Sequence, residues 1–177
     1  DSVRRSVFAG LIGLSVLVIF MIAYYRVPGA VVSLAILFFA VFTLAIYVLL
    51  PVVLTLPGIA GFVLSIATAV DANILVLERF KEELRGGRSL RGAVEAAFAR
   101  AWTSIRDSNI STLITCAILF MFGNTFGASA VKGFALTLAL GILISMFTAM
   151  VVTRALMRGF FSREIEDEAQ RASLLGA

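Results

Sequence analysis

An uncharged run from position 27 to position 70 constrains the fold of this chain more than any other feature. Two further runs, residues 6–25 and 133–153, also lack Asp, Glu, Lys and Arg. A helix needs about 20 apolar residues to cross the hydrocarbon core of a bilayer, so the longest run has room for two crossings. Backbone polar groups in lipid must be paired within the segment itself. The sequence therefore predicts an all-α fold, a polytopic transmembrane helix bundle.

The composition agrees with this class. Hydrophobic residues make up 60% of the 177 residues, and the mean hydropathy is +1.03, whereas about half is usual for soluble domains. We expect a transmembrane domain over residues 1–161 and a polar cytoplasmic tail or linker over residues 162–177. The domain has five predicted spans, at about residues 7–25, 31–50, 58–77, 110–122 and 133–157.

The charged segment between the third and fourth predicted spans contains an amphipathic pattern. Gly86-Gly87 predicts the end of one helix, and Ser89 is suited to cap the next. Apolar residues then recur at helical spacing over about residues 90–105. We expect an interfacial helix on the cytoplasmic side, with Trp102 as an anchor. A plain linker helix between two spans explains the pattern equally well.

The basic residues orient the bundle. Of the 15 Lys and Arg side chains, 12 fall on one side of the predicted spans and 3, namely Arg4, Arg5 and Lys132, on the other. Because cytoplasmic flanks are enriched in Lys and Arg, we expect the N-terminus to be extracytoplasmic and the C-terminus cytoplasmic. Arg4 and Arg5 oppose this locally. Charges that flank spans in this way argue against a nucleic-acid partner.

Asp71 is the residue with the clearest chemical signal. It lies deep in the third predicted span, where a charged side chain costs several kcal/mol. Since burial disfavours the carboxylate, the group can take up and release a proton as its surroundings change. Gly61, Ser65 and Thr68 share its helix face. The alternative is a structural Asp held by neighbouring hydroxyl groups.

Other polar residues give weaker signals. Asp107 and Asn109, at the entry to the fourth predicted span, either line a proton path or cap a helix. Asn73 lies about 200° round the helix from Asp71, so we expect it to bond a different helix. Gly141, Ser145 and Ala149 predict close helix packing. The chain has no His, no phosphate-binding glycine loop and no catalytic triad, so we predict no enzyme activity, no metal site and no cofactor.

Two segments carry a family resemblance. Thr55-Leu-Pro-Gly-Ile-Ala-Gly61 is followed by Ala69-Val-Asp-Ala-Asn-Ile-Leu-Val-Leu-Glu-Arg79. Together they resemble the signature of the SecD family, and the likeness extends over about residues 5–160. Ala67 and Leu77 depart from the usual pattern without touching Asp71. The motif positions are Thr55, Pro57, Gly58, Gly61, Asn73, Glu78 and Arg79.

The resemblance implies one half of a transporter of the RND superfamily in the bacterial inner membrane. SecF, separate or fused, would supply the other half, and proton motive force would drive preproteins out of the SecYEG translocon. Asp71 would be the proton-path carboxylate, with Asp107, Asn109, Thr68 and Ser65 as further candidates. A first transmembrane helix and an outer domain would normally precede Asp1. Membrane lipids complete the expected partners.

Two other functions remain open from the sequence. An RND-type proton-coupled exporter of small molecules or lipids would share the fold and the buried carboxylate. A scaffold that only stabilises the translocon would share the fold without carrying protons.

Overall fold

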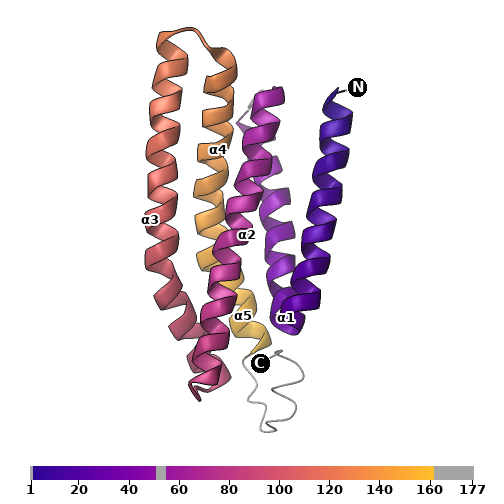
Figure 1. Ribbon diagram of the computed structural model, residues 1–177, viewed down its shortest axis with the longest axis vertical. Coiled ribbons are helices and arrows are strands. Elements are labelled where there is room, and N and C mark those ends of the chain that lie inside the picture. The colour runs from indigo at the N-terminus through magenta and orange to yellow at the C-terminus, as the bar shows by residue number, and fades with distance from the viewer. Residues whose placement is uncertain (1, 51–54, 162–177) are drawn as a thin grey trace.

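The computed structural model describes residues 2–50 and 55–161, with side chains from residue 8 onward, and all regular structure in this part is helical. The predicted all-α bundle is confirmed. The described elements are α1 (Ser2–Leu49), α2 (Leu56–Arg85), α3 (Leu90–Thr125), α4 (Ser129–Phe147), the π-helix η1 (Thr148–Thr153) and α5 (Arg154–Phe160) (Figure 1). The predicted turn at Pro51 and the predicted tail 162–177 lie outside the described residues.

Within the described residues, four helical stretches are long and apolar enough to cross a membrane: Phe8–Leu49, Leu56–Arg85, Leu90–Thr125 and Ser129–Phe160. The first of these contains a reversal at Arg26, whose backbone has φ 52° and ψ −123°. Figure 1 shows that the two halves of α1 run in opposite directions. Gly29 allows the close approach, since a Cβ on it would lie 2.1 Å from the carbonyl oxygen of Met21.

The connection between α2 and α3 follows the sequence signals. α2 ends at Arg85, and Gly87 adopts a φ of +82°, which favours glycine. The side chain of Ser89 accepts a hydrogen bond of 3.3 Å from the backbone nitrogen of Gly92. The predicted helix break at Gly86-Gly87 and the predicted cap at Ser89 are therefore confirmed.

The separation of an interfacial helix from the fourth span was wrong. Residues 90–105 and 110–122 belong to one continuous helix, α3, because no Gly or Pro interrupts residues 93–122. The apolar face of residues 90–105 is buried in a core cluster that also contains residues of α1, α2 and α5, rather than left for lipid. Its buried members are Leu90, Ala93, Val94, Ala97, Phe98, Ala101 and Ile105.

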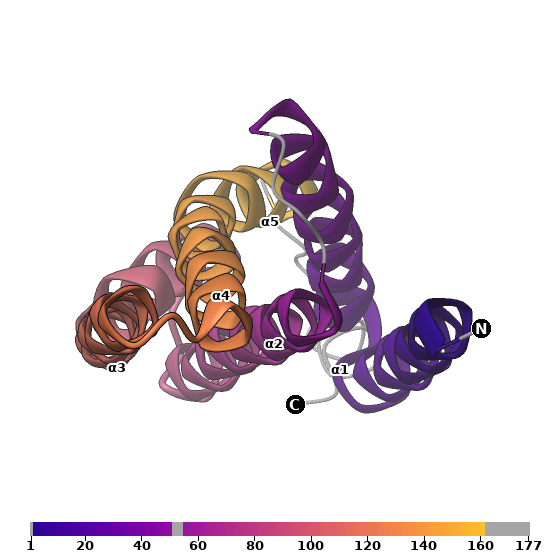
Figure 2. The same cartoon turned by 90° about the horizontal axis from the view of Figure 1, so that it is seen from above.

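The final helical stretch is also more complex than the single span that the sequence predicted. α4, η1 and α5 follow each other without a gap, and the middle six residues form a π-helix. Figure 2 shows α4 beside both α2 and α3, with the first half of α1 on the far side of α2. Gly61 of α2 allows close contact with α4, since a Cβ on it would lie 2.3 Å from Thr137 Oγ1.

Candidate functional site

Asp71 lies midway along α2, 15 residues after Leu56 and 14 before Arg85. The helix begins with a cap in which the side chain of Thr55 accepts a 3.3 Å hydrogen bond from the backbone nitrogen of Gly58. Pro57 occupies its first turn, where a missing N–H is harmless. Asp71 is exposed on the surface of this chain. A carboxylate in the middle of an apolar helix thus faces outward from its own core.

Asp71 lines a pocket of about 330 Å³, which we call the Asp71 pocket. Its walls come from α2 and α3. The lining residues are Thr68, Asp71, Ala72 and Leu75 of α2 and Ser104, Ile105, Ser108, Asn109 and Thr112 of α3. Asp71 is the only ionisable residue among them. The volume exceeds that needed for one water molecule, and the walls offer several polar partners.

Three of the four hydroxyl groups that line the Asp71 pocket donate to the backbone of their own helices. Thr68 Oγ1 donates to the carbonyl of Ser65 at 2.9 Å. Ser108 Oγ donates to the carbonyl of Ile105 at 3.1 Å, and Thr112 Oγ1 to that of Ser108 at 3.1 Å. Because the hydroxyl hydrogens of these three residues are used in this way, their oxygen lone pairs remain as acceptors for a proton-bearing group.

The structure brings together three of the predicted proton-path residues and separates two. Thr68, Asp71 and Asn109 line the Asp71 pocket. Ser65 does not; it is fully buried against α4. Asp107 is exposed and pairs with Arg106, whose Nη2 lies 2.9 Å from Asp107 Oδ1.

Asn73 joins α2 to the π-helix. Its Nδ2 donates to the carbonyl of Ala69 at 2.7 Å, and its Oδ1 accepts from Thr153 Oγ1 at 3.0 Å. The prediction that Asn73 bonds a different helix is confirmed. Sequence reasoning missed Thr153, and the only signal for it was a hydroxyl residue inside an apolar run.

The remaining motif residues make contacts at the charged end of α2. Glu78 accepts a 2.7 Å hydrogen bond from the hydroxyl of Tyr25. Arg79 forms an ion pair of 2.7 Å with Glu82. The Nζ of Lys81 lies 4.7 Å from the ring centres of both Tyr24 and Tyr25. The contacts of Glu78 and Lys81 tie α2 to α1, whereas the pair of Arg79 and Glu82 lies within α2.

Ion pairs also tie α3 to α2 and α5. Glu83 lies 2.7 Å from Arg100 Nη1, and this bond, with Arg88 nearby, lowers the pKa of the Glu83 carboxyl. Glu95 accepts hydrogen bonds from Arg158 and Arg154, and they lower its pKa to about 2. The two helices that wall the Asp71 pocket are thus joined to each other and to α5 at one end.

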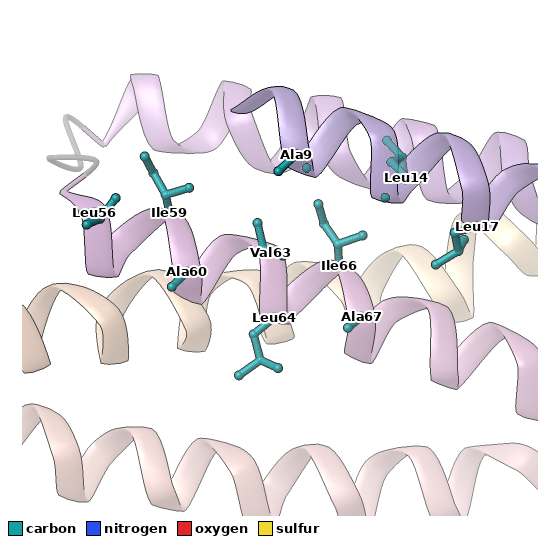
Figure 3. Close-up of a pocket in the computed structure, with 12 residues that line it drawn as sticks. Ala9, Leu14, Leu17, Leu56, Ile59, Ala60, Val63, Leu64, Ile66 and Ala67 are labelled. Atoms are coloured by element: carbon teal, nitrogen blue, oxygen red, sulfur yellow. The ribbon is translucent and has the colours of Figure 1, made fainter. Parts of the chain in front are cut away.

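Within the described part of the chain, no three His, Cys, Asp or Glu side chains are grouped so that they could hold a metal ion. A separate apolar cavity of about 770 Å³ lies between the first half of α1 and α2. Figure 3 shows Ile59, Val63 and Ile66 of α2 pointing toward α1 there. Asp71 does not line this cavity.

Comparison with known families and curated proteins gives consistent matches. The MMPL family matches residues 3–172. The chain is 58% identical to the protein translocase subunit SecD of Thermobaculum terrenum over 158 residues, which are 89% of this chain and 31% of that protein. It is 54% identical to SecD of Synechocystis sp. over 89% of this chain and 32% of that one. The chain spans about a third of the length of these relatives.

Solved structures agree with the sequence matches. A crystal structure of SecDF from Thermus thermophilus, described as a translocon-associated membrane protein, superposes with a TM-score of 0.85 at 35% identity, over 94% of this chain and 23% of that one. A structure of SecDF in a super-membrane-facing form gives a TM-score of 0.81 at 38% identity, over 92% and 22% of the two chains.

Proposed function

The chain belongs to the MMPL family, and we propose that it forms the membrane part of a SecD-type subunit that uses proton motive force to drive protein export. The similarity to SecD proteins supports the export role. The observation that carries the proton coupling is the position of Asp71, in the middle of an apolar helix and facing a polar pocket.

The proposed topology has five passes through the bacterial inner membrane. α1 supplies two of them, since the chain reverses at Arg26. The side of the bundle that carries the α2–α3 connection and α5 is cytoplasmic, which leaves the N-terminus outside. Support comes from the clustered Arg and Lys residues near these elements, in agreement with the positive-inside rule.

In the proposed mechanism, Asp71 gains and loses protons that move from the outside to the cytoplasm. Water in the Asp71 pocket would connect the carboxylate with Asn109 and Thr68. Protonation removes a charge that is costly in a low-dielectric setting, so the packing of α2 against α3 changes. A membrane potential supplies about 2.3 kcal/mol per charge per 100 mV, so a few protons suffice for a conformational step.

The proposed partners are SecF, separate or fused, the SecYEG translocon, translocating preproteins and membrane lipids. SecF has a specific place in this scheme. Since Asp71 is exposed on this chain, a second membrane domain would cover it and close the Asp71 pocket. No enzyme activity or cofactor is part of the proposal.

The experiment is Asp71→Asn in the full-length protein, reconstituted with SecF and SecYEG in vesicles. Asn keeps the size of the side chain and cannot carry a proton. We expect loss of proton entry, followed with a pH-sensitive dye, and loss of proton-driven preprotein export. Glu82→Gln is the matched control, because the ion pairs of Glu82 with Arg79 and Arg100 are exposed and lie at the end of α2. Undiminished proton-driven export in Asp71→Asn vesicles would refute the mechanism.

An RND-type exporter of small molecules or lipids is the second candidate, favoured by the apolar cavity between α1 and α2. It predicts proton-coupled efflux of an apolar compound and no effect of Asp71→Asn on preprotein export. The same vesicles, loaded with a lipophilic dye, separate the two functions.

A further inference from the structure

The hydroxyl of Thr153 has two acceptors within reach on two different helices. Asn73 Oδ1 on α2 lies 3.0 Å away, and the carbonyl of Thr148 in the π-helix itself lies 3.3 Å away. A hydroxyl carries one hydrogen, so a strong bond to one acceptor weakens the other. All three atoms are sheltered, since Thr153, Asn73 and Thr148 are buried.

Asn73 is oriented so that its oxygen faces Thr153. The 2.7 Å bond from its Nδ2 to the carbonyl of Ala69 uses one end of the amide and fixes the direction of the other. Asn73 and Asp71 stand on different faces of one rigid helix, about 200° apart. A constraint on Asn73 therefore constrains the direction in which Asp71 points.

The π-helix supplies the second half of this arrangement. A π-helix is a rare local widening that often marks a functional position. Thr148 begins this segment and Thr153 ends it. The next residue, Arg154, binds Glu95 of α3 together with Arg158. The π-helix is thus bonded to α2 through Asn73, and α5, which follows it directly, is bonded to α3 through Glu95.

We propose that Asn73 and Thr153 form a positioning pair that holds the rotation of α2 with Asp71 facing the Asp71 pocket. When Thr153 donates to Thr148 instead, this restraint on the rotation of α2 is lost and Asp71 turns away from the polar side chains of the pocket. The pair acts through Asp71 and carries no proton itself. The effect of the pair on proton transport rests on the proposed function. Its effect on the direction of Asp71 can be tested without measuring transport.

The charged groups near Asp71 are few or paired, so the reactivity of the Asp71 carboxyl can be measured without interference from them. Among the residues that the structure describes, no other ionisable side chain lines the Asp71 pocket. On α3, the nearest charges along the helix are Arg106 and Asp107, which pair with each other. On α5, Arg154 pairs with Glu95. A change in the reactivity of Asp71 therefore reports its position.

The test labels Asp71 with two carbodiimides in the full-length protein in membrane vesicles, one reagent soluble in water and one in lipid. Mass spectrometry gives the rate of each. In Thr153→Val, which replaces the hydroxyl with a methyl group, we expect the ratio of water-soluble to lipid-soluble labelling to fall about fivefold, the population change that one lost hydrogen bond corresponds to. Thr153→Ser keeps the hydroxyl and should restore the ratio.

Two further variants serve as controls for the labelling ratio of Asp71. Tyr47→Phe removes another buried interhelical bond, of 2.6 Å to the carbonyl of Thr137, and keeps its ring; it should leave the ratio unchanged. Asn73→Leu removes the acceptor from α2 and should repeat the effect of Thr153→Val. If Thr153→Val does not fold, Asn73→Leu provides the test.

Three outcomes overturn the proposal: an unchanged ratio in the variants that remove the bond, equal increases with both reagents, or an equal change in Tyr47→Phe. Proton flux measured in the same vesicles distinguishes failure of the proposed function from failure of the positioning pair. If Asp71→Asn leaves flux intact while Thr153→Val changes the ratio, the proposed function fails and the positioning pair stands.

Discussion

Ser65 of α2 lies so close to Gly141 of α4 that a Cβ on Gly141 would come within 2.3 Å of both Cβ and Oγ of Ser65. Ser65 is fully buried at this contact, and its Oγ donates to the carbonyl of Phe62 at 2.7 Å. Small residues bring the two helices together here, as is usual in membranes. The helix that carries Asp71 is therefore held by its contact with α4.

Gly141→Ala should destabilise the protein. The added methyl group has no space, and overpacking of this kind costs about 1–3 kcal/mol. Thermal unfolding of the detergent-solubilised protein measures the loss. Gly13→Ala is the control, because a Cβ there meets nothing within 4 Å. Equal unfolding temperatures for the two variants would contradict the close contact.

Helix class and several helix ends could be predicted from local chemistry. Charge-free runs predicted membrane-crossing helices, Gly86-Gly87 the end of α2, and Ser89 the start of α3. Gly141 was correctly expected in a close contact. Each of these features depends on a few neighbouring residues, which is why a single sequence contains the information.

The grouping at the site could not be predicted, because it depends on how two helices are rotated against each other. Asp71 and Asn109 are far apart in the sequence, and nothing local fixes which face of α3 meets α2. Ser104, Ser108 and Thr112, spaced by four, form a polar stripe that could have been noticed. The π-helix and Thr153 left no such mark, since hydroxyl residues occur throughout these apolar runs.

Acid should weaken the link between α3 and α5. Arg158 and Arg154 lower the pKa of Glu95 from 4.5 to about 2. The carboxylate therefore stabilises the fold fully above about pH 4.5, and this contribution is lost as the pH falls toward 2. Glu95→Gln should lower the unfolding temperature at neutral pH and show a smaller further loss between pH 4.5 and 2.

The measurement is thermal unfolding of the detergent-solubilised protein at stepwise lower pH. Glu82→Gln, which removes an exposed carboxylate, is the control and should follow the unmodified protein. An acid-induced loss in Glu95→Gln as large as that of the unmodified protein would show that the Glu95 pairs contribute nothing.

Asn109 should matter more than Asp107 for proton movement. Asn109 is buried and lines the Asp71 pocket, whereas Asp107 forms an exposed pair with Arg106, and exposed pairs contribute little. Asn109→Leu keeps the size and removes the polar groups, so proton entry into vesicles should fall several-fold. Asp107→Asn should reduce it less. The reverse order would place the proton path outside the pocket.

Tyr25→Phe should weaken the contact between α1 and α2. The hydroxyl of Tyr25 donates to Glu78 at 2.7 Å, and a hydrogen bond to a charged group contributes roughly 1.5–3 kcal/mol. The ring of Tyr25 lies 4.7 Å from Lys81 Nζ, and so does the ring of Tyr24. Both rings survive replacement by Phe, so only the hydroxyl is tested.

Tyr24→Phe is therefore the matched control for this contact. Within the described residues, the hydroxyl of Tyr24 makes no hydrogen bond, so its removal should leave the unfolding temperature unchanged while Tyr25→Phe lowers it. If Tyr25→Phe is as stable as Tyr24→Phe, the bond from Tyr25 to Glu78 does not hold α1 to α2. The contacts of Lys81 with the two rings, which both variants keep, would then be the remaining polar link between α1 and this end of the helix that carries Asp71.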